Sequence, residues 1–241
     1  MELTMQWTPP LNPKRYHLEQ LLAARSISLD WLNSGDTDPY SPANVARYSI
    51  VKAAETIPFH YRGAVTDNPE LLSWLAELVA QARKDQADRH APIAAVTHGR
   101  SLLLLGPTGT GKTHQAYGAI RELAIAGVAA TWVVTTAADM YAALRPRHGI
   151  DSEAEFRRYR NATVLLLDDL GAERKPTEFT EEINFRLINW RYEHQLPTLI
   201  TSNLVPKEIA ERLGDRVTSR LIEMCQRVVF KGADRRRGEA A

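Results

Sequence analysis

Residues 106–113, GPTGTGKT, have the composition and spacing of a loop that binds nucleotide phosphates. The segment directly follows an apolar run and opens a helical stretch, which is the context that this pattern requires. Gly106, Gly109 and Gly111 let the backbone turn tightly, so that its N–H groups can face phosphate oxygens at the helix N-terminus. We therefore interpret the segment as a phosphate loop rather than a chance glycine-rich turn. The expected binding residues are Gly106, Pro107, Thr108, Gly109, Thr110, Gly111, Lys112, Thr113 and His114.

Side chains that complete such a site occur in this loop and in a second motif, TVLLLDDLG. Lys112 supplies a point charge for the β- and γ-phosphates, and the Thr113 hydroxyl is a candidate ligand of Mg²⁺. A buried strand that ends in two acids brings Asp168 to the metal, through water, and Asp169 to the water that attacks the γ-phosphate. The predicted cofactors are ATP and Mg²⁺. Many such ATPases carry Glu in place of Asp169, so we expect the shorter side chain to make hydrolysis slow or dependent on assembly.

Asn203 follows the apolar run TLITS and is a further candidate for catalysis. An amide at the tip of a strand beside the phosphate loop can hydrogen-bond the attacking water or the γ-phosphate. Asn after a strand is also a common turn former. Its place between the acidic motif and an arginine pair favours the catalytic interpretation.

Arg216 and Arg220 lie four residues apart in the segment GDRVTSRL, so in a helix they share one face. In one interpretation they are neutralised by carboxylates of the same chain, such as Asp215 or Glu223. In the other, the helix presents them to ATP bound by a neighbouring subunit, where an arginine stabilises the developing phosphoryl charge. The phosphate loop and the acidic motif favour the second interpretation.

Five short apolar runs, separated by helical stretches, define the fold class. Near-continuous apolar runs indicate strands that are covered on both faces, and their alternation with helices indicates a parallel sheet. We therefore predict an α/β three-layer domain with a five-stranded parallel sheet. The expected strands are SLLLL (101–105), TWVV (131–134), TVLLL (163–167), TLITS (198–202) and RVVF (227–230).

Residues 1–62 differ from the rest, because prolines interrupt short helical patterns and no segment has the pattern of a strand. Ser41 followed by Pro42 has the form of an N-cap and first helical residue, which opens a helix to about Glu55. A longer helix is expected at about residues 68–88.

We predict two parts: a small helical N-terminal module at residues 1–62 and an ATPase domain at residues 63–241. The module is either a flap packed on the main domain or a docking module. In the second case an exposed apolar face, including Trp7 or Trp31, would wait for a partner. The sequence leaves both interpretations open.

The composition describes an ordinary folded protein of 241 residues, with 44% hydrophobic and 24% charged residues and a formal net charge of +1. These values exclude a disordered chain and a strongly basic nucleic-acid coat protein. The single cysteine, Cys225, excludes an internal disulfide and fits a reducing cytoplasm. The sequence starts without the pattern of a signal peptide, and its apolar runs are too short to span a membrane. We expect a cytoplasmic protein with no membrane partner.

The motifs GPTGTGKTH, LLLDDLGAE, LITSNL, GDRVTSRL and KGADRRR, in this order, resemble those of the DnaC/DnaI/IstB group of AAA+ ATPases, most of all a DnaC-type helicase loader. IPFHYRGA resembles the segment that precedes the ATPase core in this group, so the resemblance covers about residues 57–237. It implies an AAA+ (ASCE P-loop) fold. A C-terminal helical lid is not expected, because the chain stops soon after the last strand, as in this group.

The resemblance also implies self-assembly into an ATP-bound spiral or ring, in which one subunit completes the site of the next. On this basis Arg220 is the expected catalytic finger, and Arg216 braces the interface or contacts the nucleotide. Loader-like members place a hexameric DnaB-like replicative helicase on single-stranded DNA and hold it through their N-terminal module. IstB-like members assist a transposase on duplex DNA. We expect a helicase loader, with the transposition ATPase as the alternative; a small-molecule kinase is disfavoured because no arginine-rich lid segment is evident.

Residues 137–161 occupy the position of DNA-facing helices in the initiator and loader clade, which is again an implication of the resemblance. Five arginines there could meet phosphates and make binding sensitive to salt. Acids are interleaved with them, so a solvated, salt-bridged helix face is the alternative. The arginines are Arg145, Arg147, Arg157, Arg158 and Arg160, and the acids are Asp139, Asp151, Glu153 and Glu155.

Overall fold

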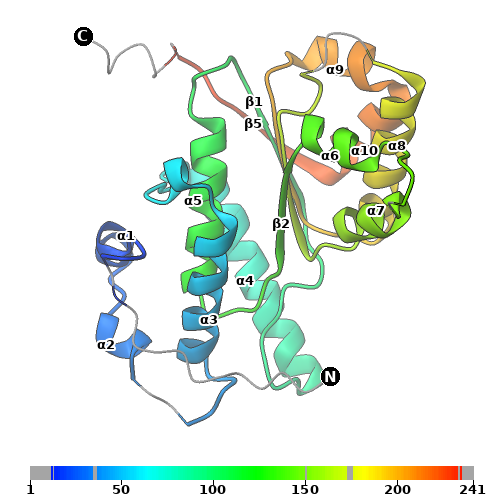
Figure 1. The fold of residues 1–241 in the computed structure, drawn as a ribbon. Coiled ribbons are helices and arrows are strands. Elements are labelled where there is room, and N and C mark those ends of the chain that lie inside the picture. Colours follow the sequence, from blue (N-terminus) through cyan, green and yellow to red (C-terminus); the bar gives the residue numbers. More distant parts are fainter. Residues whose placement is uncertain are drawn as a thin grey trace. The chain divides into compact units, whose positions relative to one another are not determined.

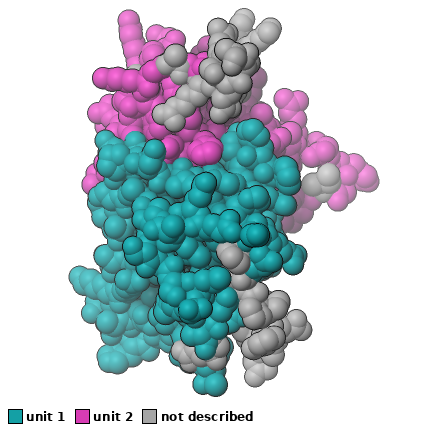
Figure 2. Space-filling model, turned by 90° about the vertical axis from the view of Figure 1, so that its left-hand side faces the viewer, with its two compact units in different colours: residues 1–96, 117–130 teal, residues 97–116, 131–241 magenta. Residues whose placement is uncertain are grey.

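The computed structural model describes residues 12, 14–34, 37–149, 151–172, 176–232 and 234. The chain divides into two compact units (Figure 2). Unit 1 comprises residues 1–96 and 117–130, and unit 2 comprises residues 97–116 and 131–241. In the described parts, no helix is both long and apolar enough to cross a membrane.

Unit 2 is built on a parallel sheet with the strand order β2-β3-β4-β1-β5 (Figure 1). The central strands β1, β3 and β4 are buried along their whole length, whereas the edge strands β2 and β5 are partly exposed. The predicted five-stranded parallel sheet is confirmed. The strands are β1 (Ser101–Leu105), β2 (Trp132–Thr136), β3 (Val164–Asp168), β4 (Thr198–Ser202) and β5 (Cys225–Val229).

One face of this sheet is covered by the helices of unit 2 (Figure 1). Apolar side chains of β1, β3 and β4, such as Leu103, Leu167 and Ile200, share one core with side chains of those helices, such as Ile188 and Leu221. This core fixes α8 and α10 beside each other. The helices are α6 (Ala137–Leu144), α7 (Ser152–Arg160), α8 (Glu178–Glu193), α9 (Pro206–Leu213) and α10 (Asp215–Met224), and α5 (Lys112–Ile125) begins in unit 2 at the end of the loop after β1.

Unit 1 is helical in its described residues, apart from one isolated β-bridge between Ala95 and Ala129. Two helices start at side-chain caps. Ser41 Oγ accepts from the backbone N–H of Asn44, which confirms the predicted cap, and Asn68 Oδ1 accepts from the backbone N–H of Leu71. The elements of unit 1 are α1 (Glu19–Ala24), α2 (Leu29–Leu32), α3 (Pro42–Thr56), the 3₁₀ turn η1 (Phe59–Tyr61), α4 (Pro69–Arg89) and the part of α5 from residue 117 on.

The predicted boundary at residue 62 stays a prediction. Trp31 is 39% exposed and is thus available at the surface, whereas Trp7 lies outside the described residues.

Arg191, on α8, is fully buried, and its guanidinium ties together separate parts of unit 2. Its Nη1 donates to the carbonyl oxygens of Tyr159 (3.2 Å) and Ala162 (2.8 Å), at the end of α7 and just before β3. Its Nη2 donates to Pro197 O (2.7 Å) and its Nε to Thr198 Oγ1 (2.7 Å), at the start of β4. Burial lowers the pKa of Arg191 to about 9, so these acceptors offset a real desolvation cost.

Replacement of Arg191 by Met should lower the free energy of unfolding by about 3 kcal/mol or more, since several buried oxygens lose their donor. Urea denaturation of the whole chain measures this change. The matched control is Arg186→Met on the same helix, where an exposed ion pair with Glu153 (2.7 Å) is lost and a change below about 1 kcal/mol is expected. Similar losses in the two variants would contradict a clamping role for Arg191.

Candidate nucleotide-binding site

The parallel sheet brings three predicted motifs together at the carboxyl-terminal ends of its strands. The phosphate loop follows β1, Asp168 ends β3, and Asn203 follows β4. In the observed strand order, β4 lies between β3 and β1. Because the carboxyl ends of parallel strands share one edge, Asn203 is placed between the lysine of the loop and the two acids.

The phosphate loop takes the backbone conformation that its glycines permit. Gly106, Gly109 and Gly111 have φ values of 146°, 81° and 94°, which other residues rarely adopt. A Cβ atom on Gly106 would lie 2.2 Å from the carbonyl oxygen of Phe230, so only glycine fits beside the end of β5. The hydroxyl of Thr110 braces the turn by donating to Pro107 O (2.9 Å).

Four predicted loop residues have different surroundings. Pro107, Thr108 and His114 are exposed, whereas Thr110 is buried. Their backbone or side-chain contacts with nucleotide stay predictions.

Lys112 is 5% exposed and connects the loop to the end of β4. Its Nζ donates to Gly106 O (2.7 Å), to Pro107 O (2.9 Å) and to Asn203 Oδ1 (2.8 Å). The structure thus brings the loop lysine and Asn203 together, while the contact of Asn203 with water or the γ-phosphate stays a prediction. The ammonium group is held at the loop, where a phosphate-binding charge is needed.

Asp168 is buried between two hydroxyl donors. Thr113 Oγ1 donates to its Oδ1 at 3.0 Å, and Thr201 Oγ1 donates to the same oxygen at 2.5 Å. Burial raises the pKa of the Asp168 carboxyl, with the neighbouring charge of Asp169 adding to the effect, while the two hydroxyl bonds and Lys112 oppose it. The carboxylate is thus kept largely out of water at the end of a central strand.

The oxygens of Thr113 and Asp168 suit a hard divalent cation. Across the part of the chain that the structure describes, no group of three or more His, Cys, Asp or Glu side chains is placed to hold a metal. Mg²⁺ fits such a sparse set, because it is usually bound by one or two protein oxygens together with waters and substrate phosphates.

Asp169 has a left-handed backbone (φ 56°), which is uncommon outside glycine and is fixed here by two contacts. Its backbone N–H donates to Thr201 Oγ1 (2.9 Å), and its Oδ1 accepts from Asn203 Nδ2 (3.0 Å). Since Asn203 Oδ1 accepts from Lys112, one amide connects the loop lysine to the candidate base. Five predicted site residues thus belong to one hydrogen-bonded network: Lys112, Thr113, Asp168, Asp169 and Asn203.

Sequence reasoning missed Thr201, whose hydroxyl contacts both acids of the second motif. A signal was present, because Thr201 precedes Asn203 by two residues and side chains two apart in a strand point to the same face. It also missed Asp234, in the motif KGADRRR, whose carboxylate lies against Gly109 of the phosphate loop, where a larger residue would place its Cβ atom. Arg235, Arg236 and Arg237 of that motif lie outside the described residues.

Arg220 is held by α8 rather than by an acid. Its Nε donates to Asn189 Oδ1, and its guanidinium lies 5.4 Å from the ring centroid of Phe185. Arg216, which is exposed, lies 5.7 Å from the same ring. Within the described residues neither arginine forms an ion pair, so the interpretation in which Asp215 or Glu223 neutralises them is not supported.

The two arginines also stay apart from the nucleotide network of their own chain. Among the hydrogen bonds between described residues, Arg220 donates only to Asn189 and to Arg216 O (3.3 Å). The structure therefore assembles the loop, acids and amide, but does not add the arginine pair to them.

The segment at 137–161 has the salt-bridged character of the alternative interpretation. Arg158 pairs with Glu155 (2.5 Å), and Arg157 lies 3.6 Å from Asp151. The guanidinium of Arg160 lies 4.2 Å from the ring centroid of Trp190. Contact of this segment with DNA stays a prediction, for which Arg145 and Arg147 are exposed and, among the described residues, form no ion pair.

A family model described as "IstB-like ATP binding protein" matches residues 77–239, which is more than half of the chain. The chain belongs to the IstB-like ATP-binding protein family. Its membership agrees with the loop-and-acid network, and the resemblance drawn from the motifs is confirmed.

Relatives of this IstB-like chain include an insertion-sequence ATP-binding protein and a replicative helicase loader. It is 36% identical over 118 residues to the putative ATP-binding protein of insertion sequence IS5376 from Geobacillus stearothermophilus, covering 48% of this chain and 45% of that protein. It is 25% identical over 142 residues to the replicative helicase loader DnaI of Bacillus subtilis, and the match covers 56% of this chain and 45% of DnaI. The chain thus spans about half the length of such curated relatives.

A solved structure of the DnaC helicase loader has the same fold, with a TM-score of 0.57 and 24% sequence identity. The match covers 72% of this chain and all of the solved chain. It confirms the AAA+-like α/β fold.

Thr201→Val should reduce ATP turnover by about tenfold or more, because an isosteric side chain without the hydroxyl releases both Asp168 and the backbone N–H of Asp169. Steady-state hydrolysis at saturating ATP tests this, with nucleotide affinity measured in parallel. Thr135→Val is the matched control, since Thr135 is buried on β2 and its hydroxyl donates to Thr136 O (3.0 Å), outside the network. Equal turnover in the two variants would contradict the role of Thr201.

Magnesium-dependent ATP binding should weaken as the pH falls through the raised pKa of Asp168, above the ordinary value of 3.8. The folded state holds this proton more tightly than the unfolded state, so the contribution of Asp168 to the free energy of unfolding falls as the pH rises through the same window. Binding and folding therefore change in opposite directions. Nucleotide titrations with and without Mg²⁺ across mildly acidic pH measure the effect.

The control for this prediction is Asp168→Asn, which should lose the magnesium dependence at every pH. A magnesium response that survives in this variant would show that another group holds the metal.

Proposed function

We propose that this IstB-like chain is an ATP-dependent loader that binds a hexameric replicative helicase and places it on single-stranded DNA. The observation that carries the proposal is the network in which Asn203 joins Lys112 to Asp169, while Arg220 lies on a separate helix face. Such a site can bind nucleotide alone yet lacks an arginine for the transition state. The similarity to the replicative helicase loader DnaI supports loading as the process that ATP controls.

The residues of the network take complementary roles in the proposed hydrolysis. Lys112 and the loop N–H groups bind the phosphates, and Thr113 and Asp168 would hold Mg²⁺, which offsets phosphate charge when bound. Asp169 accepts a proton from the attacking water, and Asn203 orients that water. Because Asp is one methylene shorter than Glu, this base reaches the water less well, which accounts for the slow turnover that we expect.

In the proposed assembly, Arg220 of one subunit faces the ATP of the next. Its contact with Asn189 and the ring of Phe185 orients the guanidinium without neutralising it, so its charge remains for a phosphate. Arg216, one turn away, braces the same interface. A shared site makes hydrolysis depend on assembly into a spiral or ring, in the cytoplasm where replication takes place.

The second candidate is an ATPase that assists a transposase on duplex DNA. The observation that favours it is the 36% identity to the putative ATP-binding protein of an insertion sequence, together with the IstB-like family match. The nucleotide network serves either role equally, so the partner decides between them.

The whole chain should form a stable complex with the replicative helicase of its own genome and increase, with ATP, the amount of helicase that acts on single-stranded DNA circles. Size-exclusion chromatography and a strand-displacement assay measure the two effects. Lys112→Ala, which removes the phosphate-binding charge, should lose the ATP response. A chain that ignores the helicase but binds and stimulates a transposase on duplex DNA would contradict the loader proposal.

A further inference from the structure

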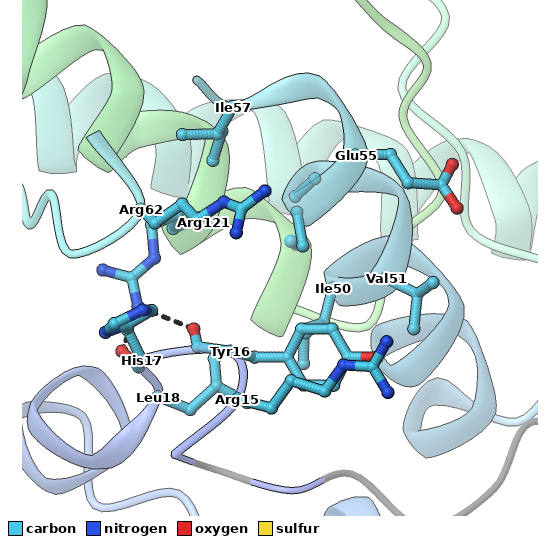
Figure 3. A pocket seen from close by; sticks show the side chains of 13 residues that line it. Arg15, Tyr16, His17, Leu18, Ile50, Val51, Glu55, Ile57, Arg62 and Arg121 are labelled. Atoms are coloured by element: carbon cyan, nitrogen blue, oxygen red, sulfur yellow. Dashed lines mark hydrogen bonds between the residues drawn. The ribbon is translucent and has the colours of Figure 1, made fainter. Parts of the chain in front are cut away.

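Unit 1 contains a cavity of about 300 Å³ that the nucleotide site does not use (Figure 3). Its walls come from residues 15–18, from α3 and the turn after it, and from the part of α5 in this unit. The lining combines apolar side chains with arginines. The residues that carry the argument are Leu18, Ile50, Ile57, Arg15, Arg62 and Arg121.

Arg121 is 5% exposed and has no acidic partner among the described residues. Its Nη1 donates to Ala64 O (2.5 Å), and its Nη2 donates to the carbonyl oxygens of Tyr16 (3.4 Å) and His17. The guanidinium carries more N–H donors than these contacts use. Burial lowers the pKa of Arg121, and the charge of the adjacent Glu122, which is itself paired with Arg25, partly opposes this effect.

The rim of the cavity adds positive charge. Arg15 and Arg62 are exposed, and the described residues include no ion pair to either. Each lies over an aromatic ring, Tyr16 at 5.6 Å and Phe59 at 5.2 Å, which orients a guanidinium without neutralising it.

The acid of the lining does little to balance this charge. Glu55 pairs with Lys52 at 2.8 Å, on the exposed side of α3. Three guanidiniums and one carboxylate, that of Glu55, thus line the same cavity. Planar guanidiniums are well suited to bind carboxylates through bidentate hydrogen bonds.

We propose that this arginine cavity, defined by Arg15, Arg62 and Arg121, is a docking site for an acidic segment of a protein partner. The recess accepts an apolar side chain against Leu18, Ile50 and Ile57, and the arginines bind the neighbouring carboxylates. A nucleic-acid backbone offers phosphates but no apolar group for these walls, so an acidic peptide fits the lining better. The inference deepens the proposed loader function, because it names a surface of unit 1 that would hold a protein partner, and it rests on that function.

The probe is a fluorescently labelled peptide of alternating Leu and Glu with an amidated C-terminus, titrated onto the whole chain and followed by anisotropy. We expect saturable binding that weakens with salt. The double variant Arg15→Ala/Arg62→Ala, which leaves the buried Arg121 and its carbonyl contacts in place, should bind the peptide about tenfold more weakly. Arg83→Ala/Arg89→Ala removes the same charge from exposed positions of α4 outside the cavity and should bind like the original chain.

Several results would overturn the proposal: no saturable binding, equal binding by the rim and control variants, or equal binding of a peptide with Lys in place of Glu. Binding of inorganic phosphate without binding of the peptide would assign the cavity to a small anion instead. Helicase binding is measured separately with the same variants. A chain that binds its helicase equally well with and without the rim arginines refutes the cavity as the docking site while the loader function stands, and peptide binding without helicase binding supports the cavity while the loader function fails.

Discussion

The nucleotide site of unit 2 depends on a buried carboxylate, Asp168, that is held by the hydroxyls of Thr113 and Thr201. An ionised acid at the end of a central strand is costly to bury, and these two donors keep it in place. Thr113 lies at the start of α5, just after β1 and the phosphate loop, and Thr201 lies in β4. The contact therefore exists only if β4 lies between β3 and β1, so the strand order and the chemistry are one constraint.

The same constraint explains why one amide joins the loop lysine to the second acid. Asn203 uses its two ends differently, accepting from Lys112 and donating to Asp169, because it extends from the strand between them. The left-handed backbone of Asp169 is the cost of aiming this second acid toward the amide.

Much of this arrangement could be predicted from the sequence. Where the predicted strand bounds were wrong, the differences have physical causes. The runs at β1 and β4 match the predicted residues in full. Strand β3 continues to Asp168, a polar residue that prediction left out, because its backbone pairs with Thr136 of β2. Strand β5 begins earlier than predicted, at Cys225 and Gln226, since backbone pairing with β1 does not require apolar side chains at a sheet edge.

The side-chain partners were harder to predict than the motifs. The spacing of Arg216 and Arg220 indicates a shared helix face, but the contact with Asn189 arises from packing between two helices, which spacing alone does not encode. Likewise, no motif marks the cavity of unit 1, whose arginines come from distant parts of the chain. Such sites depend on tertiary structure, and they are where the structure adds most to the sequence.

In the proposed assembly, one chain binds ATP in the Lys112 network and a neighbouring chain supplies Arg220. The most direct test mixes Arg220→Ala subunits with Asp169→Asn subunits and measures ATP turnover. Each variant alone should bind ATP and hydrolyse little, whereas the mixture should recover part of the original rate, because intact sites of the first face intact arginines of the second. No recovery, with both variants folded and assembling together, would contradict a site shared between subunits.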